Sequence, residues 1–165
     1  MNGFKCCMIY IAAIGIAGFL FGRALPKRWF RYDELPFREL PVEHGGNLYR
    51  KIGIHRWHKR LPDMSRLLPS TMPKKQLTAH ISAAQAEIMV QETCIAEFIH
   101  ALLSLCGMYL PSLWPGPGGL IFCLLYVALG NLPFILVQRF NRPKLRMLLD
   151  KCRHAEKLTG NAAEN

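Results

Sequence analysis

Several local patterns that mark common classes of enzyme site are missing from this sequence. The chain has no C-x-x-C pair, no glycine-rich phosphate loop and no G-x-S-x-G turn, and its six cysteines are scattered. Most of these cysteines stand inside apolar runs, where cysteine behaves as a small apolar residue. The sequence therefore predicts no disulfide framework, no metal cluster and no tightly bound cofactor.

Charge is also scarce over much of the chain. Three apolar runs, each of roughly 17–18 residues, would each span about 26 Å as a helix, which is the short end of what a bilayer core requires. A soluble helical domain would carry polar faces through such runs. The sequence therefore predicts one all-α domain over residues 1–165. We expect a small integral membrane protein with about three transmembrane helices, at about 5–22, 93–110 and 119–137.

The first apolar run has two interpretations. A cleaved signal peptide would also begin with a charged residue, here Lys5, and continue into apolar sequence. Residues 21–26 and the basic residues after them contain no Ala-x-Ala-like cleavage site. We therefore expect this segment to be retained as a membrane anchor.

Basic residues are distributed unevenly around the three runs. The chain carries 21 Lys and Arg against 11 Asp and Glu, yet residues 107–119, between the second and third runs, contain no charge. Lys and Arg concentrate after the first run and after the third. Because cytoplasmic connections are enriched in basic residues, we expect the N-terminus outside. A basic loop over residues 23–92 and a basic tail over residues 138–165 are then inside.

Aromatic residues are interleaved with basic ones in the predicted inner loop. Such a mixture suits the headgroup layer, where rings lie at the interface and cations meet anionic lipid. Nucleic acid is the other partner for a basic surface, but the chain has no known nucleic-acid-binding motif, and we predict no such partner. Residues 77–91 permit a helix that leads into the second span. In the tail, Leu145, Leu148, Leu149 and Cys152 have helical spacing, which predicts an amphipathic helix on the membrane surface.

One face of the second span carries polar side chains. Thr93, Glu97, His100 and Ser104 are spaced by four, three and four residues, so they share a helix face. A carboxylate three residues from a histidine can pair with it, which lowers the cost of burying the charge and raises the basicity of the imidazole. Such a histidine can deprotonate an attacking hydroxyl. The alternative is a structural salt bridge that locks two helices together.

The end of the third span is also polar. Pro133 removes a backbone donor, so we expect the helix to kink there. Asn131 would then bond to the freed carbonyl or face Glu97 and His100. Two amides and two arginines follow: Gln138, Arg139, Asn141 and Arg142. Such a group can hold a phosphate, a carboxylate or a sugar; the alternative is a stop-transfer anchor.

His58 and Asp63 form an H-x4-D pattern. Glycerolipid acyltransferases use this spacing for a histidine and the aspartate that orients it. Pro62 inside the spacer and the lack of a nearby phosphate-binding glycine motif make the pattern weak support for such a site.

Three segments share motifs with a known family. Residues 49–63, with residues 43–46 ahead of them, form a basic stretch that ends in Leu-Pro-Asp. Residues 92–100 read Glu-Thr-x-x-x-Glu-x-x-His, and residues 131–143 read Asn-Leu-Pro-Phe-Ile-Leu-Val-Gln-Arg-Phe-Asn-Arg-Pro. These segments resemble the glycosyl-4,4'-diaponeurosporenoate acyltransferases, small bacterial membrane proteins. The resemblance, over roughly residues 29–146, implies a cell-membrane acyltransferase, not an aminoacyl one, that completes staphyloxanthin-type carotenoid synthesis by esterifying the sugar of a glycosylated carotenoid acid.

On this interpretation, a fatty acyl donor, a thioester, meets a hydroxyl of a lipid-linked glycoside at the cytoplasmic interface, among membrane lipids. We expect His100 to be the general base, Glu97 to orient it, and Glu92 to be a second catalytic candidate. The expected substrate-binding residues are Asn131, Gln138, Arg139, Asn141, Arg142, Trp57, Lys59 and Asp63. The alternative is a non-enzymatic scaffold or accessory subunit that binds other enzymes of the pathway.

Overall fold

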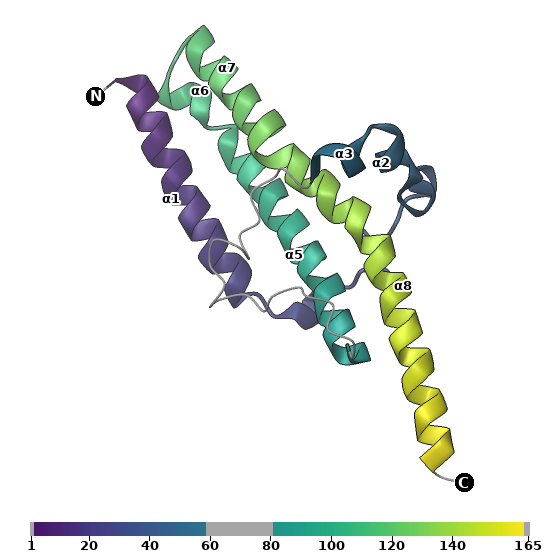
Figure 1. The fold of residues 1–165 in the computed structure, drawn as a ribbon. Coiled ribbons are helices and arrows are strands. Elements are labelled where there is room, and N and C mark those ends of the chain that lie inside the picture. The colour runs from purple at the N-terminus through teal and green to yellow at the C-terminus, as the bar shows by residue number, and fades with distance from the viewer. Residues whose placement is uncertain (1, 59–80, 164–165) are drawn as a thin grey trace.

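The computed structural model describes residues 2–58 and 81–163, and the regular structure in these residues is entirely helical. Three helical segments are long and apolar enough to cross a membrane: Gly3–Ala24, Ala83–Leu113 and Pro117–Thr159. The second lies between the first and the third in Figure 1. The predicted all-helical architecture with three spans is confirmed, and these helices are those of a multi-pass membrane protein.

The first span, α1 (Gly3–Ala24), packs on the second through small residues. A Cβ at Gly18 would lie 3.2 Å from a methyl carbon of Leu103, and one at Gly22 would lie 3.1 Å from a side-chain carbon of Ile99. Glycine at these positions lets two spans approach closely. Another face of α1 is apolar and exposed, including Ile9, Ile16 and Leu20. Such a surface suits lipid and would be unfavourable in water.

The second span, α5 (Ala83–Gly107), begins well before the apolar run predicted for it. Ser82 and Gln85 cap its start reciprocally, because each side chain accepts the other residue's amide at 3.2 Å. The helix predicted over residues 77–91 is confirmed from residue 83 onward, and residues 77–80 lie outside the described part. The helical approach to the span and the span itself are therefore one continuous helix.

The connection between the second and third spans is compact. It contains α6 (Leu110–Leu113) and turns at Gly116, whose φ of 105° favours glycine. The next helix, α7 (Pro117–Leu125), starts at once. It lies so close to the turn that a Cβ at Gly119 would stand 2.0 Å from the carbonyl oxygen of Trp114.

The third span changes its hydrogen-bonding pattern midway. A π-helical turn, η4 (Tyr126–Asn131), separates α7 from α8 (Leu132–Ala163). The amide that ends this turn donates to a carbonyl five residues back. Because Pro133 has no N–H to offer, the irregularity predicted beside it is present, in the form of a π-helical turn. The turn leaves Asn131 only 1% exposed, inside the bundle.

The tail is the continuation of α8 through Pro143 to Ala163. Its apolar stripe, predicted to lie on a membrane surface, instead packs against the start of α5, around Ala83, Ala86 and Val90. The membrane-surface prediction was therefore wrong for these residues. The physical reason is that α5 begins early enough to cover the stripe.

Residues 25–58, called the arm below, contact α5 in their first part and α8 in their later part (Figure 1). The arm contains four short helical turns: η1 (Lys27–Trp29), η2 (Pro41–Gly46), α2 (Asn47–Lys51) and α3 (Ile54–Trp57). Tyr49 and Ile54 are buried with Phe140 of α8 in one apolar cluster. The arm is therefore a folded element of the protein.

The chain reverses direction at a left-handed turn that ends η2, just before α2. His44, Gly45 and Gly46 have φ angles of 45°, 67° and 86°, which favour glycine over residues with a Cβ. The reversal brings Glu43, before the turn, into hydrogen-bonding contact with Tyr49, after it. The two residues can then approach the same point on α8.

Candidate functional site

Arg139 of α8 is the centre of a buried ionic network. Its Nε donates to Oε1 of Glu97 at 2.7 Å, and its Nη1 donates to Oε1 of Glu43 at 2.6 Å. Its Nη2 donates to the carbonyl oxygen of Pro36 at 2.6 Å. One guanidinium therefore ties α8 to α5 and to two points of the arm.

Arg142, one turn further along α8, completes the network. Its Nη2 donates to Oε2 of Glu97, and its Nε donates to the hydroxyl oxygen of Thr93 at 2.9 Å. Its Nη1 donates to the carbonyl oxygen of Phe37 at 2.7 Å. Each carboxylate oxygen of Glu97 thus accepts from a different arginine.

The network is charge-balanced, with two carboxylates and two guanidinium groups. The side chains of Glu43 and Glu97 are 6% and 9% exposed, and those of Arg139 and Arg142 are 15% and 5% exposed. Within the described residues, every buried side-chain nitrogen or oxygen has a partner. Removing one partner of a buried ion pair costs about 3–5 kcal/mol, because the other charge is left uncompensated. The network therefore holds α5, α8 and the arm together.

Glu43 lies outside the spans and is also held by the arm itself. Tyr49 donates its hydroxyl hydrogen to Oε1, and the amide of Leu40 donates to Oε2 at 3.0 Å. Burial acts to raise the pKa of Glu43, but the hydrogen bonds from Tyr49 and Arg139 outweigh it and hold the pKa below its ordinary value. Burial, and then the Glu43 carboxylate, raise the pKa of Tyr49 far above its ordinary value. Tyr49 therefore remains a donor and Glu43 remains ionised.

A second polar contact lies one turn further into the bundle, about 4.5 Å along α5. Nδ1 of His100 is 3.0 Å from Oδ1 of Asn131, and Nδ2 of Asn131 donates to the carbonyl oxygen of Tyr126 at 3.2 Å. The Tyr126 carbonyl can only accept, so it fixes which end of the amide faces the imidazole. Oδ1 can also only accept, so Nδ1 of His100 carries a proton, and in the neutral imidazole Nε2 then has the lone pair.

The imidazole of His100 is further fixed by packing. Its ring stacks on Phe134, with centroids 4.7 Å apart and planes 8° from parallel. The side chain is half-buried, and Nε2 makes no hydrogen bond to any described residue. The arrangement therefore presents an oriented proton acceptor with nothing bound to it from within the described chain.

Glu97 and His100 do not bond to each other in the structure. The predicted pairing of the two is replaced by a bond from Glu97 to the arginines and a bond from His100 to Asn131. Charge-assisted bonds from guanidinium to carboxylate are about twice as strong as neutral ones, and α8 offers two of them. The sequence predicted that Glu97 and His100 share one face of α5. Their hydrogen-bonding partners in the third span determine that each bonds there and not to the other.

Asn131 faces His100, as one of the two predictions for it stated. Its amide nitrogen also bonds to a backbone carbonyl in the irregular turn, that of Tyr126. The carbonyl that Pro133 leaves without its helical donor is that of Leu129, so the predicted bond to the freed carbonyl is not the one observed. One amide makes both contacts because it has a donor end and an acceptor end.

Other predicted site residues lie apart from these two centres. Glu92 bonds to Lys27 of η1 at 2.9 Å, with side chains 30% and 43% exposed, so it is not part of the network. Gln138 and Asn141 are half-buried, and their side chains make no hydrogen bond within the described residues. Trp57 packs on the apolar cluster that joins the arm to α8.

The H-x4-D pattern cannot be followed to its end. Lys59 and Asp63 lie outside the described residues. His58 is described, and its Nδ1 is 2.9 Å from the carbonyl oxygen of Ile54, within α3. Its ring also contacts Phe140 edge to face.

Glu43 and Tyr49 belong to the network, although the sequence did not mark them as site residues. The chain interval from Glu43 to Arg139 is 96 residues, so no local spacing relates them. The available signal was the Glu-His-Gly-Gly stretch at residues 43–46, whose two glycines permit the left-handed turn.

Little space remains beside the two arginines. The cavity between the arm and α8 at this point has a volume of about 10 Å³, which is room for about one water molecule. The guanidinium groups therefore bind protein oxygens here and leave no room for a sugar or a phosphate. No group of three or more His, Cys, Asp or Glu among the described residues is placed to hold a metal ion.

The fold and the site define a small multi-pass helical membrane protein. A charge-balanced arginine–glutamate network joins its second and third spans, with a histidine–asparagine pair one turn away. Residues 26–151 match the CrtO family model, glycosyl-4,4'-diaponeurosporenoate acyltransferase, and the chain belongs to this family. The resemblance drawn from three sequence segments is confirmed, and the activity at family level is acyl transfer.

The chain is similar to curated relatives over most of its length. The glycosyl-4,4'-diaponeurosporenoate acyltransferases of Staphylococcus aureus strains bovine RF122 / ET3-1 and MRSA252 are each 29% identical to it over 151 residues. These matches cover 90% of this chain and 88% of each relative. No solved structure matches the chain.

Proposed function

We propose that the protein esterifies a hydroxyl of a lipid-linked sugar, such as that of a glycosylated carotenoid acid, with a fatty acyl group from a thioester donor. The observation that carries this proposal is the His100–Asn131 pair, which orients the imidazole and leaves its Nε2 without a partner in the described residues. An acyl transfer to a hydroxyl needs a group that removes the hydroxyl proton. Membership of a family named for acyl transfer gives the reaction class.

In the proposed reaction, Nε2 of His100 takes the proton of the sugar hydroxyl as its oxygen attacks the thioester carbonyl. Collapse of the tetrahedral intermediate breaks the carbon–sulfur bond. The leaving thiolate then takes the proton from the imidazolium, and His100 returns to its starting state. Asn131 holds the ring in the tautomer that leaves Nε2 free, in the manner of the asparagine of cysteine–histidine–asparagine sites.

The roles expected of the other residues are revised in this proposal. Arg139 and Arg142 act as positioning residues, because their N–H groups are bonded to protein oxygens. Glu97 likewise holds the arginines and does not orient the histidine. Gln138 of α8 has no protein partner in the described residues and lies seven residues after Asn131, about two helical turns along the third span. It is the proposed contact for a sugar hydroxyl.

The test is ester formation by the purified full-length protein from an acyl thioester and a glycosylated carotenoid acid. Replacing His100→Gln should lower kcat about 10²–10⁴-fold, the usual contribution of a positioned base. His154→Gln, at an exposed position of α8, is the control and should leave the rate unchanged. Activity of His100→Gln within about twofold of the wild type would remove the histidine from the reaction.

A comparison of lipid extracts separates the enzyme from the scaffold alternative. Cells that express the protein beside a candidate glycoside should contain an acylated glycoside that is absent from cells expressing His100→Gln. An unchanged lipid profile, together with loss of pathway enzymes that co-purify with the protein, would favour a scaffold.

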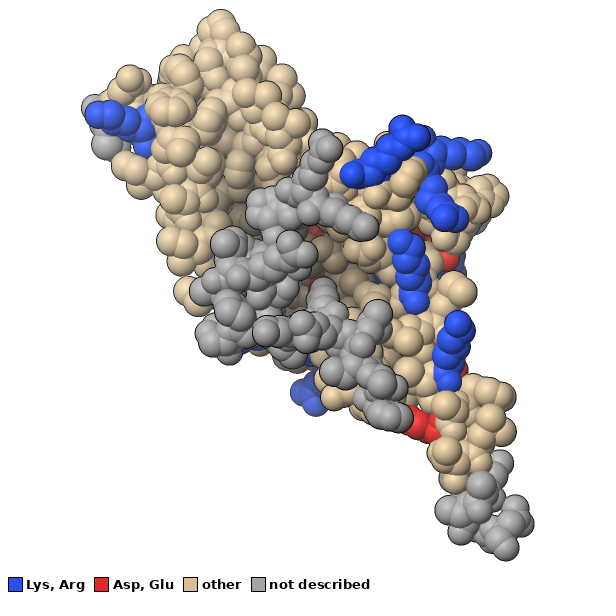
Figure 2. Space-filling model, in the orientation of Figure 1, with Lys and Arg blue, Asp and Glu red and all other residues tan. Residues whose placement is uncertain are grey.

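We also propose a bacterial cell-membrane location with the N-terminus outside and α8 ending in the cytoplasm. On the face seen in Figure 2, basic side chains lie over the arm and α8, whereas the end formed by α6 and α7 shows only uncharged residues. One basic patch lies beside the N-terminus. Cytoplasmic reporters fused after residue 165 should be active, and the same reporters before residue 1 should be inactive. The opposite pattern would reverse this topology.

A further inference from the structure

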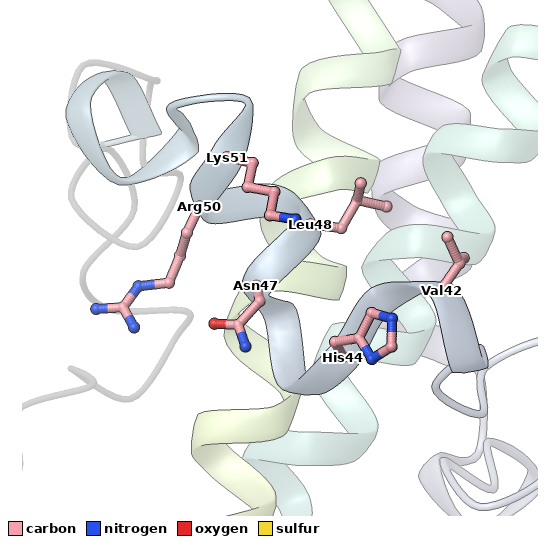
Figure 3. Close-up of a pocket in the computed structure, with 6 residues that line it drawn as sticks. All are labelled: Val42, His44, Asn47, Leu48, Arg50 and Lys51. Carbon is pink, nitrogen blue, oxygen red and sulfur yellow. The ribbon is translucent and has the colours of Figure 1, made fainter.

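The arm has a second face, apart from the one that bonds to α8. An open pocket of about 540 Å³ is lined by Val42, His44, Asn47, Leu48, Arg50 and Lys51 (Figure 3). Glu43 and Tyr49 fall between these residues in the sequence, and they are buried in the network and in the apolar cluster with α8. One short segment therefore carries network residues on its inner face and the pocket on its outer face.

The chemistry of the pocket is basic and amphipathic. Arg50, Lys51 and His44 line it with one amide and two apolar side chains, and no acidic residue is among its lining residues. Arg50 and Lys51 are exposed and have no ion pair or hydrogen bond within the described residues. In the arginines of the network, by contrast, every guanidinium nitrogen donates to a protein oxygen. Figure 2 shows the basic side chains of this region gathered over α2 and α3.

We propose that this pocket binds the phosphate ester of a phosphopantetheine-linked acyl donor. Guanidinium and ammonium groups bind phosphate oxygens through charge-assisted hydrogen bonds. Arg50 and Lys51, which have no partner among the described residues, would supply them. Val42 and Leu48 add apolar surface for the linear part of such a ligand. The assignment to a donor rests on the proposed acyl transfer; phosphate binding by the pocket does not.

Two features favour the donor over the headgroup of an anionic phospholipid as the source of the phosphate. The pocket volume lies in the range of sites for small molecules, about 300–1,000 Å³, which exceeds what a single headgroup phosphate needs. The second feature is the position of the arm. Arg139, where the arm is anchored, lies eight residues after Asn131 in the third span, which is roughly 12 Å along the helix. A phosphopantetheine chain holds its thioester well away from its phosphate and can bridge such an interval.

The experiment measures binding to the full-length protein in neutral detergent by calorimetry. The probes are 4'-phosphopantetheine, pantetheine without the phosphate, and phosphatidylglycerol. The pocket variant is Arg50→Gln/Lys51→Gln. The matched control is Lys151→Gln/Lys157→Gln, which removes the same charge from exposed positions of α8.

We expect the pocket variant to weaken 4'-phosphopantetheine binding about tenfold or more, and the control to change it less than about twofold. Pantetheine should bind weakly to all three proteins. In the transfer assay, the pocket variant should raise KM for the donor while kcat stays within about twofold.

If the control variant weakens 4'-phosphopantetheine binding as much as the pocket variant does, the proposed phosphate site is wrong. Equal binding of the phosphorylated and unphosphorylated probes would also contradict it. Pocket-dependent binding of phosphatidylglycerol without binding of 4'-phosphopantetheine would overturn the donor assignment in favour of a lipid headgroup. Pocket-dependent binding of 4'-phosphopantetheine by a protein that transfers no acyl group would support the phosphate site and contradict the proposed function alone.

Discussion

The contact between α5 and α8 contains two polar regions that differ in how completely they are bonded. Around Arg139 and Arg142, every guanidinium nitrogen donates to a protein oxygen, and the charges cancel. Around His100, a neutral pair is fixed at one end and free at the other. The network is buried, and the adjoining cavity of about 10 Å³ leaves no room for a substrate. The proposed function therefore places the chemistry at His100 and leaves a stabilising role to the network.

The largest expected effect comes from uncoupling the network. Glu97→Gln should lower the free energy of unfolding by about 3–5 kcal/mol, because it leaves two buried guanidinium groups facing one carboxylate. Glu87→Gln is the matched control, since Glu87 pairs with Arg153 with side chains 40% and 45% exposed, and exposed pairs contribute about 0–1 kcal/mol. Thermal unfolding in detergent measures both. Equal melting temperatures for the two variants would show that the buried network does not stabilise the fold.

The next effect should appear in catalysis and not in stability. Asn131→Ala removes the acceptor for Nδ1 of His100 and frees the ring, so kcat should fall about 10²-fold. Asn131→Asp keeps an acceptor oxygen and should recover part of the rate. Assays of both variants, with far-UV circular dichroism to compare their folds, check this. If Asn131→Asp is as inactive as Asn131→Ala, orientation of the ring is not the role of this side chain.

A smaller effect is expected where the arm supports the network. Tyr49→Phe removes the hydroxyl donor to Glu43 and should cost about 1.5 kcal/mol of unfolding free energy, at the lower end for a bond to a charged group. Tyr109→Phe serves as control, because Tyr109 is 54% exposed and its hydroxyl makes no hydrogen bond in the described residues. An equal loss of unfolding free energy in Tyr109→Phe would contradict a stabilising role for the hydrogen bond from Tyr49 to Glu43.

The smallest expected effect is a loss of stability at acid pH. The pKa of Glu43 is lower in the folded protein than its ordinary value, so its contribution to stability is full above the unfolded value of about 4.3. That contribution is lost as the pH falls through the folded pKa, because the unfolded chain binds the proton more readily than the folded protein and is stabilised by it. Melting temperatures of the wild type and Glu43→Gln, measured from pH 7 downward, should converge in acid. Parallel curves would exclude this linkage.

Much of the fold followed from local patterns. The three apolar runs predicted three spans, since a bilayer core requires long apolar helices, and the four polar residues from Thr93 to Ser104 predicted one polar face on the second. Asn131 and the two arginines were marked because polar residues in a span need partners. Local spacing could indicate that these groups would be bonded, but not to which partner.

The misassigned elements share one cause. The pairing of Glu97 with His100 used the nearest ionisable neighbour in sequence, and the membrane-surface tail used an assumed lipid surface. In the folded chain, α8 offers Glu97 stronger partners, and α5 covers the tail stripe. Which of several possible partners a side chain bonds to depends on which of them the fold brings close to it.

The sequence by itself determined that the chain is helical and membrane-embedded, that its family is one of acyltransferases, and which side chains are too polar for lipid. These properties depend on composition and on spacing within single helices. Only the tertiary structure decided that the arm returns to α8, that Glu43 completes the ionic network and that His100 keeps one nitrogen free. Those outcomes depend on contacts between segments up to 105 residues apart in the chain, and helical periodicity contains no information about such distances.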